Sequence, residues 1–191
     1  HWGAEPMRWR LKADGSVLQM DRRAGHVKSE KSVRLDTLPV LWLGHLCANA
    51  SGMPTTSVLS GADDMVCLQP LSQAKALAIL HDLMHLYQQA WLSPLPLPSK
   101  TACAYVLALH NNRASASSGS PHSQALSEAK KIFHGSRFYK GECQTSAYVQ
   151  RVFTQFEDMD IDMFSTLANH VYGPMLQACQ AVNDAQEQDK A

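Results

Sequence analysis

Residues 7–25 read MRWRLKADGSVLQMDRRAG, and this stretch decides the fold of the chain. At its centre lies Asp14-Gly15, a dipeptide favoured in tight β-turns because glycine readily adopts a positive φ. On either side, residues 7–13 and 16–24 alternate loosely between apolar and polar side chains, as strands with one buried face do. The stretch therefore predicts a β-hairpin near the start of the chain.

Downstream of this hairpin, the sequence predicts a second hairpin and a series of helices. The predicted elements are a helix over 36–50, short strands over 56–60 and 64–69 around Gly61-Ala62-Asp63, a helix over about 72–92, a helix over 100–110 and further helices over 122–184. The helix over 72–92 carries an apolar stripe made of Leu77, Leu80, Met84, Tyr87 and Trp91. Strands first and helices afterwards are typical of an α+β protein.

The length of the chain, 191 residues, suits a single domain that buries a core without a disulfide or a metal. We expect one domain over 1–191, with a sheet-rich core over 1–70, a mostly helical part over 71–184 and a flexible loop over 111–121, where the sequence NNRASASSGSP is low in complexity. The chain begins His1-Trp2-Gly3 without an initiator Met, so we also expect a fragment of a larger protein.

The composition excludes several classes of protein. A hydrophobic content of 45% with 18% charged residues indicates a globular chain, and no apolar run reaches the ~18–20 residues of a membrane span. The five cysteines are far apart and form no C-x-x-C pair, so reduced thiols in a cytoplasmic protein are expected. The net charge is zero, but residues 1–35 hold eight basic and four acidic residues, whereas residues 157–191 are acidic. A basic N-terminal sheet favours contact with phosphate, although a solvated face gives the same pattern.

The second strand of the hairpin resembles the strand of restriction-endonuclease-like nucleases that carries the [D/E]-x-K motif. Asp21 falls at the position of a metal-binding carboxylate, and Arg23 at the position of the lysine. The other metal-binding Asp of such nucleases lies about thirteen residues earlier, which is Arg8 in this chain. Two carboxylates hold Mg²⁺ in that chemistry, and the lysine supports the attacking water. The resemblance therefore implies a degenerate, non-catalytic site with no metal and no cofactor.

Two enzyme alternatives remain open at this stage. An active Mg²⁺-dependent DNA nuclease would need carboxylates from elsewhere, and the candidates are Glu5, Asp63 and Asp64. A zinc hydrolase could use His81 and His85, which lie at i and i+4 in the predicted helix, as in H-E-x-x-H enzymes. Against the zinc interpretation, Asp82 stands where that motif has glutamate, and no third ligand is indicated by position. Outward-facing histidines on an amphipathic helix are the preferred interpretation.

Later segments resemble the C-terminal domain of the RecC family, the gamma subunits of bacterial exodeoxyribonuclease V. The matching segments are the long helix leading to Pro94-Leu95-Pro96-Leu97-Pro98-Ser99-Lys100, then Ala129, Phe133-His134-Gly135, Gly141-Glu142 and Tyr148. The resemblance covers about residues 38–180, with Phe133 where tryptophan is usual. It implies a nuclease-like fold without activity that serves as a scaffold for RecB and RecD in double-strand break repair and recombination. Contact with DNA or with a partner is then expected at Arg8, Arg10, Arg22 and Arg23.

Overall fold

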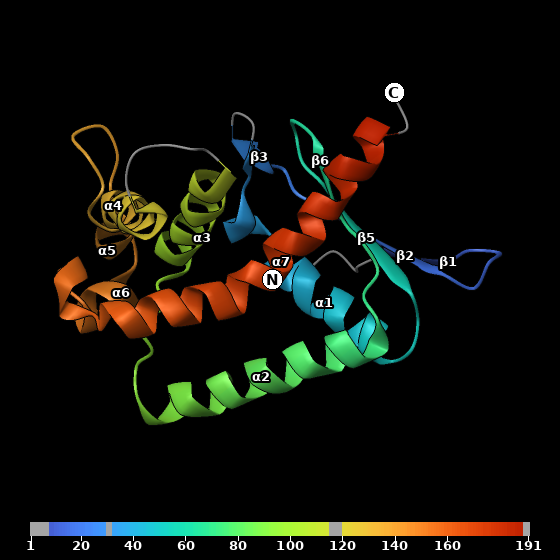
Figure 1. Ribbon diagram of the computed structural model, residues 1–191, viewed down its shortest axis with the longest axis horizontal. Helices are drawn as coiled ribbons and strands as arrows, with labels where there is room; N and C mark the ends of the chain where they lie inside the picture. The colour runs from blue at the N-terminus through green and yellow to red at the C-terminus, as the bar shows by residue number, and fades with distance from the viewer. Residues whose placement is uncertain (1–7, 30–31, 115–119, 189–191) are drawn as a thin grey trace. The chain divides into compact units, whose positions relative to one another are not determined.

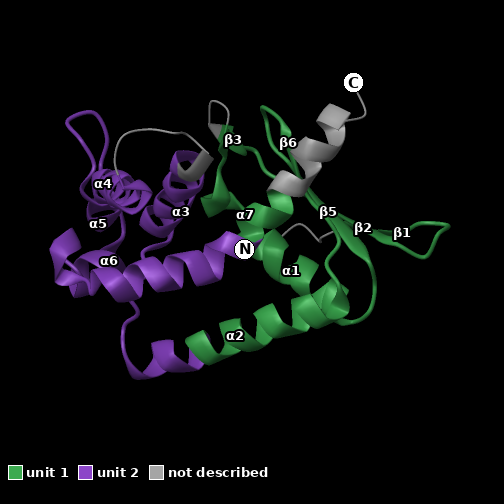
Figure 2. Cartoon of the chain, viewed as in Figure 1, with its two compact units in different colours: residues 1–86, 175–191 green, residues 87–174 purple. Residues whose placement is uncertain are grey.

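The computed structural model describes residues 8–29, 32–114 and 120–188. The contacts within the chain divide it into two compact units, residues 1–86 with 175–191 and residues 87–174 (Figure 2). The expectation of a single domain stays a prediction. The predicted α+β class is confirmed, since a small mixed sheet and several helices make up the described residues.

The first unit is built on a four-stranded sheet with the order β1-β2-β5-β6 (Figure 1). Its strands are β1 (Arg8–Leu11), β2 (Val17–Arg22), β5 (Thr55–Ser60) and β6 (Met65–Leu68). Both predicted hairpins are present as the antiparallel pairs β1/β2 and β5/β6. The two hairpins are joined by parallel pairing of β2 with β5, which requires a crossover between them.

The first hairpin closes as its sequence predicts. Gly15 has a φ of 81° in the turn. The carboxylate of Asp14 accepts hydrogen bonds from the backbone N–H of Ser16 at 2.9 Å and from its hydroxyl at 2.6 Å. These local bonds satisfy the turn, so the register of β1 against β2 is set by residues close in the sequence.

The crossover between the hairpins contains short elements and one helix. In chain order these are β3 (Lys28–Ser29), β4 (Ser32–Val33), the 3₁₀ helix η1 (Leu35–Thr37) and α1 (Pro39–Ala50). Helix α1 packs on β5, and its buried side chains are those of Leu41, Trp42, His45, Leu46, Ala48 and Asn49. Asn49 fixes the end of α1, because its side-chain oxygen accepts from the backbone N–H groups of Thr55 and Leu71, each at 3.1 Å.

Helix α2 (Gln73–Leu92) confirms the predicted long helix, but its apolar stripe is not buried. Only Ala76 is buried in this helix. Leu77, Met84, Tyr87 and Trp91 are each more than half exposed. Periodicity alone therefore located the helix correctly but did not establish what its apolar side faces.

The second unit is helical around a cluster of aromatic rings. Its elements are the end of α2, α3 (Ser99–Ala114), α4 (Pro121–His134), α5 (Glu142–Thr145), α6 (Ala147–Val152), η2 (Phe156–Asp158) and the first half of α7 (Ile161–Gln188). Phe156 lies 5.9 Å from Phe133 and 5.6 Å from Phe164 between ring centroids, and Tyr105 lies 5.4 Å from Phe164. The second half of α7 belongs to the first unit, where the carbonyl of Ala178 accepts from the Gln69 N–H at 3.4 Å.

Several residues of the loop predicted over 111–121 lie in helices. Helix α3 continues to Ala114 and α4 begins at Pro121, while residues 115–119 lie outside the described part of the chain. Among the residues that the structure describes, no helix combines the length and the apolar character that a membrane span requires.

Candidate functional site

Asp21 lies near the end of β2, on the face of the sheet that α1 covers. Along β2, Val17 and Gln19 are buried and Asp21 is half-buried, and alternate residues of a strand point to the same face. Asp21 pairs with the buried Leu59 of β5, and one of its carboxylate oxygens accepts from the Arg22 N–H at 2.7 Å. The site therefore begins with a single carboxylate at the edge of the core.

The register of the hairpin does not bring Arg8 and Asp21 onto one face. Arg8 pairs with Met20 and Arg10 with Leu18, so both arginines lie on the face opposite Asp21. The residue of β1 opposite Gln19, on the face of Asp21, is Trp9. The spacing of about thirteen residues in the nucleases leads to Arg8, whereas the β1 residue on the face of Asp21 is the next one along the chain. The idea that a fixed positive charge from Arg8 occupies a metal position therefore loses its geometric basis.

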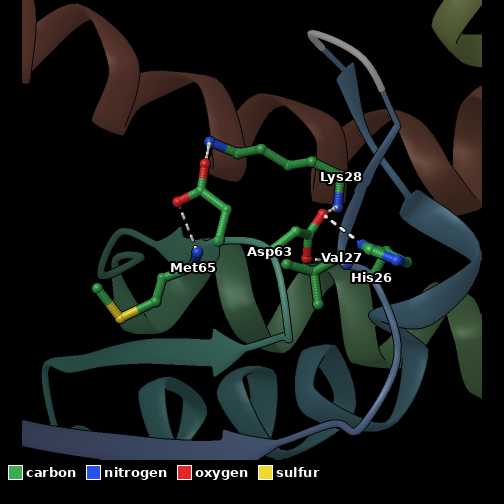
Figure 3. A network of polar contacts seen from close by, with 6 residues as sticks. His26, Val27, Lys28, Asp63 and Met65 are labelled. Carbon is green, nitrogen blue, oxygen red and sulfur yellow. Dashed lines mark hydrogen bonds and ion pairs between the residues drawn. The ribbon is translucent and has the colours of Figure 1, made fainter.

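Asp63 and Asp64 form a clasp between the β5–β6 turn and the segment after β2 (Figure 3). The two carboxylate oxygens of Asp63 accept from the backbone N–H groups of Val27 at 2.9 Å and Lys28 at 3.1 Å, and His26 lies 3.5 Å away. The Asp64 carboxylate accepts from the Lys28 ammonium at 2.5 Å. The hydrogen bond from Val27 is the main reason that the pKa of Asp63 is lowered to about 2.

The clasp bears directly on the active-nuclease alternative. Both acidic side chains use their oxygens within the clasp, and Glu5, the third candidate, lies outside the described residues. Across the described ranges, no group of three or more His, Cys, Asp or Glu side chains is placed to hold a metal ion. Asp21 is the one carboxylate that the described parts of β1 and β2 place on the α1 face.

A buried chain of polar side chains follows the same face of β2 as Asp21 and joins the sheet to α1. The Ser57 hydroxyl donates to the Gln19 side-chain oxygen at 2.7 Å and lies 2.9 Å from Nδ1 of His45. Because Ser57 gives its one proton to Gln19, Nδ1 of His45 is the donor in the second bond. All three residues are fully buried, so these hydrogen bonds join β2, β5 and α1 inside the core, while Nε2 of His45 has no hydrogen-bond partner among the described residues.

His45 itself stays neutral at ordinary pH. Burial lowers its pKa to about 4, and the backbone of Gln69 opposes this shift to a smaller extent. Its ring stacks on Trp42 with the centroids 5.5 Å apart. The role that follows from these contacts is to hold α1 against the sheet.

The opposite face of the hairpin is basic. Arg8, Arg10 and Arg22 lie there with Leu18 and Met20, and all three arginines are exposed. On one face of an antiparallel pair of strands, the Cβ atoms of directly opposite or diagonal residues are roughly 5–8 Å apart. In the described part of the chain none of the three forms an ion pair, so their charge is open to an anionic partner. Arg23 follows the end of β2, where its N–H donates to the Ser60 carbonyl at 2.9 Å.

The two histidines of α2 come together as their spacing predicts. Nε2 of His81 lies 3.2 Å from Nε2 of His85, and the rings meet edge to face with centroids 4.5 Å apart. Both side chains are exposed. The described residues bring no third ligand to the pair, whereas a hydrolytic zinc site has three protein ligands and an open position.

The fold and the site define an α+β protein whose small mixed sheet has one basic face and, in the part of the chain that the structure describes, a single carboxylate on the α1 face of its first hairpin. The chain belongs to the RecC C-terminal domain family, because a model of that family matches residues 4–110, more than half of its length. This family assigns the chain a subunit role in the RecBCD complex, exodeoxyribonuclease V, in DNA repair and recombination. A search of curated proteins found no match.

Proposed function

We propose that this chain is a non-catalytic scaffold domain of RecC, which holds RecB and RecD in a cytoplasmic bacterial complex and contacts DNA through the basic face of its first hairpin. The observation that carries the proposal is the register that puts Arg8, Arg10 and Arg22 together on one exposed face, where none of them has an ionic partner among the described residues. Arginines in such an arrangement bind phosphate and make binding sensitive to salt.

A degenerate nuclease fold is the second part of the proposal. The chain runs from a hairpin into a helix that packs on the sheet, as the resemblance to restriction-endonuclease-like nucleases implies. Asp21 stands near the end of the second strand, but Asp63 and Asp64 are committed to the clasp. One carboxylate is too few to hold the Mg²⁺ that this chemistry requires.

The DNA contact is tested by charge reversal in the complex assembled with RecB and RecD. Arg8→Glu, Arg10→Glu and Arg22→Glu together should lower the slope of log affinity against log salt by about 0.9 for each phosphate that the protein no longer neutralises. A matched control reverses three exposed cations elsewhere, Lys75, Lys100 and Arg151. The control changes net charge equally, so an equal decrease of the slope in both variants would reject a contact at the hairpin face.

The absence of catalysis is tested with the purified chain and labelled single- and double-stranded DNA. We expect equal signals with Mg²⁺, with Mn²⁺ and with a chelator, and no effect of Asp21→Ala. Metal-dependent cleavage that Asp21→Ala abolishes would establish the active-nuclease alternative instead.

A further inference from the structure

The loop Ser136–Lys140, between α4 and α5, presents an aromatic side chain almost completely to solvent. Phe138 is 94% exposed, the highest value among the large hydrophobic residues that the structure describes, and the adjacent Tyr139 is 49% exposed. Exposing a phenylalanine ring forfeits roughly 1.5–3 kcal/mol of burial free energy. A ring exposed to this extent is accessible to a partner, and Tyr139 beside it offers a second aromatic side chain.

At the base of this loop, the two backbone segments pack closely against each other. Gly135 has a φ of 79°, and a Cβ added there would lie 2.3 Å from the backbone nitrogen of Gly141. A Cβ added to Gly141 would lie 2.2 Å from the carbonyl oxygen of Phe133. Backbone therefore lies directly against backbone on both sides of the base, an approach that only glycine permits.

Hydrogen bonds hold the tip itself. Gly135 and Lys140 form an isolated antiparallel bridge, and the Ser136 N–H donates to the Tyr139 carbonyl at 2.9 Å. The N–H of Phe138 donates to the Ser136 hydroxyl at 3.1 Å. These contacts lie within the loop and hold the backbone that carries Phe138.

Both ends of the loop are anchored in the second unit. On one side, Phe133 is fully buried and packs on Phe156. On the other side, the carboxylate of Glu142 is buried and accepts the backbone N–H of Thr101 at 2.8 Å. A ligand that touched the tip would therefore meet a fixed platform, which lowers the entropy lost on binding.

The charge of the loop indicates which kind of partner fits. Arg137 and Lys140 flank the aromatic pair, both are exposed, and neither forms an ion pair among the described residues. The carboxylates of neighbouring helical segments are engaged elsewhere, since Glu128 pairs with Lys131 and Glu157 with Lys130. A purely apolar protein pocket would leave these two cations unmatched. Unpaired nucleotides offer both a flat ring for stacking and a phosphate for each cation.

We propose that the loop Ser136–Lys140 is a stacking site for single-stranded DNA, in which Phe138 lies against an unpaired base and Arg137 and Lys140 face the flanking phosphates. Duplex DNA would not bind at this loop, because its bases are stacked on each other and their faces are not accessible to Phe138. The site adds a second contact to the proposed DNA-handling role and rests on that role.

The test is fluorescence anisotropy of a short labelled oligothymidine titrated with the chain. Phe138→Ala should weaken binding by roughly 5- to 150-fold, the effect of removing one base–aromatic stack, whereas Phe138→Trp should keep it. Tyr148→Ala is the matched control, because Tyr148 is another highly exposed aromatic residue, 83% exposed, outside the loop. The control should bind like the unchanged chain, and a duplex of the same length should be insensitive to Phe138→Ala.

The same assay separates this site from the basic face of the hairpin. Loss of binding in the Arg8, Arg10 and Arg22 variant with no effect of Phe138→Ala would overturn the stacking site and leave the proposed function standing. Insensitivity to both changes, or no binding by the unchanged chain, would overturn the stacking site, and the salt slope of the assembled complex would then decide the contact at the hairpin face. If Phe138→Ala leaves DNA binding intact but weakens assembly with RecB and RecD, the loop is a protein contact and the proposal is wrong.

Discussion

The carboxylate of Glu142 should be among the most sensitive groups in the second unit. It accepts four hydrogen bonds at the start of α3, from the Ser99 hydroxyl at 3.3 Å, the Lys100 N–H at 3.1 Å, and the N–H and hydroxyl of Thr101, each at 2.8 Å. These backbone groups belong to the first turn of a helix, which has no carbonyl partners for its N–H groups. Glu142→Gln replaces one acceptor oxygen with an amide donor.

The size of the effect follows from this count. Two of the four donors lose their acceptor, and each donor that is left without a partner costs about 1–3 kcal/mol. The negative charge at the N-terminal end of a helix contributes roughly 0.3–1 kcal/mol more. We therefore expect Glu142→Gln to lower the free energy of unfolding by about 2–7 kcal/mol, or the melting temperature by roughly 4–28 °C.

Urea unfolding followed by far-ultraviolet circular dichroism measures this change directly. Glu128→Gln is the control, because Glu128 is an exposed carboxylate of the same unit that pairs with Lys131, and exposed ion pairs contribute little. We expect no resolvable change for the control. A midpoint for Glu142→Gln that coincides with that of the control would refute the role of Glu142 as the anchor of α3.

Two further predictions concern His45 and Gly141. Unfolded histidine has a pKa of 6.5 and folded His45 one of about 4, so the unfolded chain binds the extra proton between these values and stability falls as pH is lowered through this window. His45→Gln should remove this dependence, reducing the slope of unfolding free energy by about 1.4 kcal/mol per pH unit, whereas an unchanged slope between pH 6.5 and 4 would show that His45 is not buried in its neutral form. Gly141→Ala should destabilise the chain and weaken oligothymidine binding together, because its Cβ would lie 2.2 Å from the Phe133 carbonyl oxygen. In contrast, Gly52→Ala, at a positive φ outside both proposed DNA contacts, should affect stability alone and leave DNA affinity unchanged, a difference that thermal melts and anisotropy together resolve.

Local patterns in the sequence predicted the elements well. The turn at Asp14-Gly15, the second hairpin and the long helices all depend on residues close together in the chain, and all are present. The α+β class followed from their order. The parallel pairing of β2 with β5 could not be predicted in this way, because it depends on the crossover through α1 and on contacts between distant residues.

The site depended on information that the sequence does not carry locally. A shift of one residue in register moves a side chain to the other face of a sheet, and this shift separates Arg8 from Asp21. Asp63 was a candidate metal ligand in the sequence, because its partners Lys28 and Val27 lie 35 and 36 residues away along the chain. In the sequence, Gly141-Glu142 stands out only through the resemblance to the RecC family. In the structure, the Glu142 carboxylate accepts hydrogen bonds from Ser99, Lys100 and Thr101 and so anchors the start of α3.

Strand β1 lies at the edge of the sheet, and no strand among the described residues pairs with its outer side. An open edge of this kind invites a second molecule to add a strand, which leads to self-association. Two copies meeting edge to edge would bring the side chains of Arg8 and Arg10 close to like charges, so repulsion keeps the molecules apart. Removing these charges with alanine would therefore favour aggregation, whereas glutamate at both positions restores a like-charged edge and keeps the variant monodisperse.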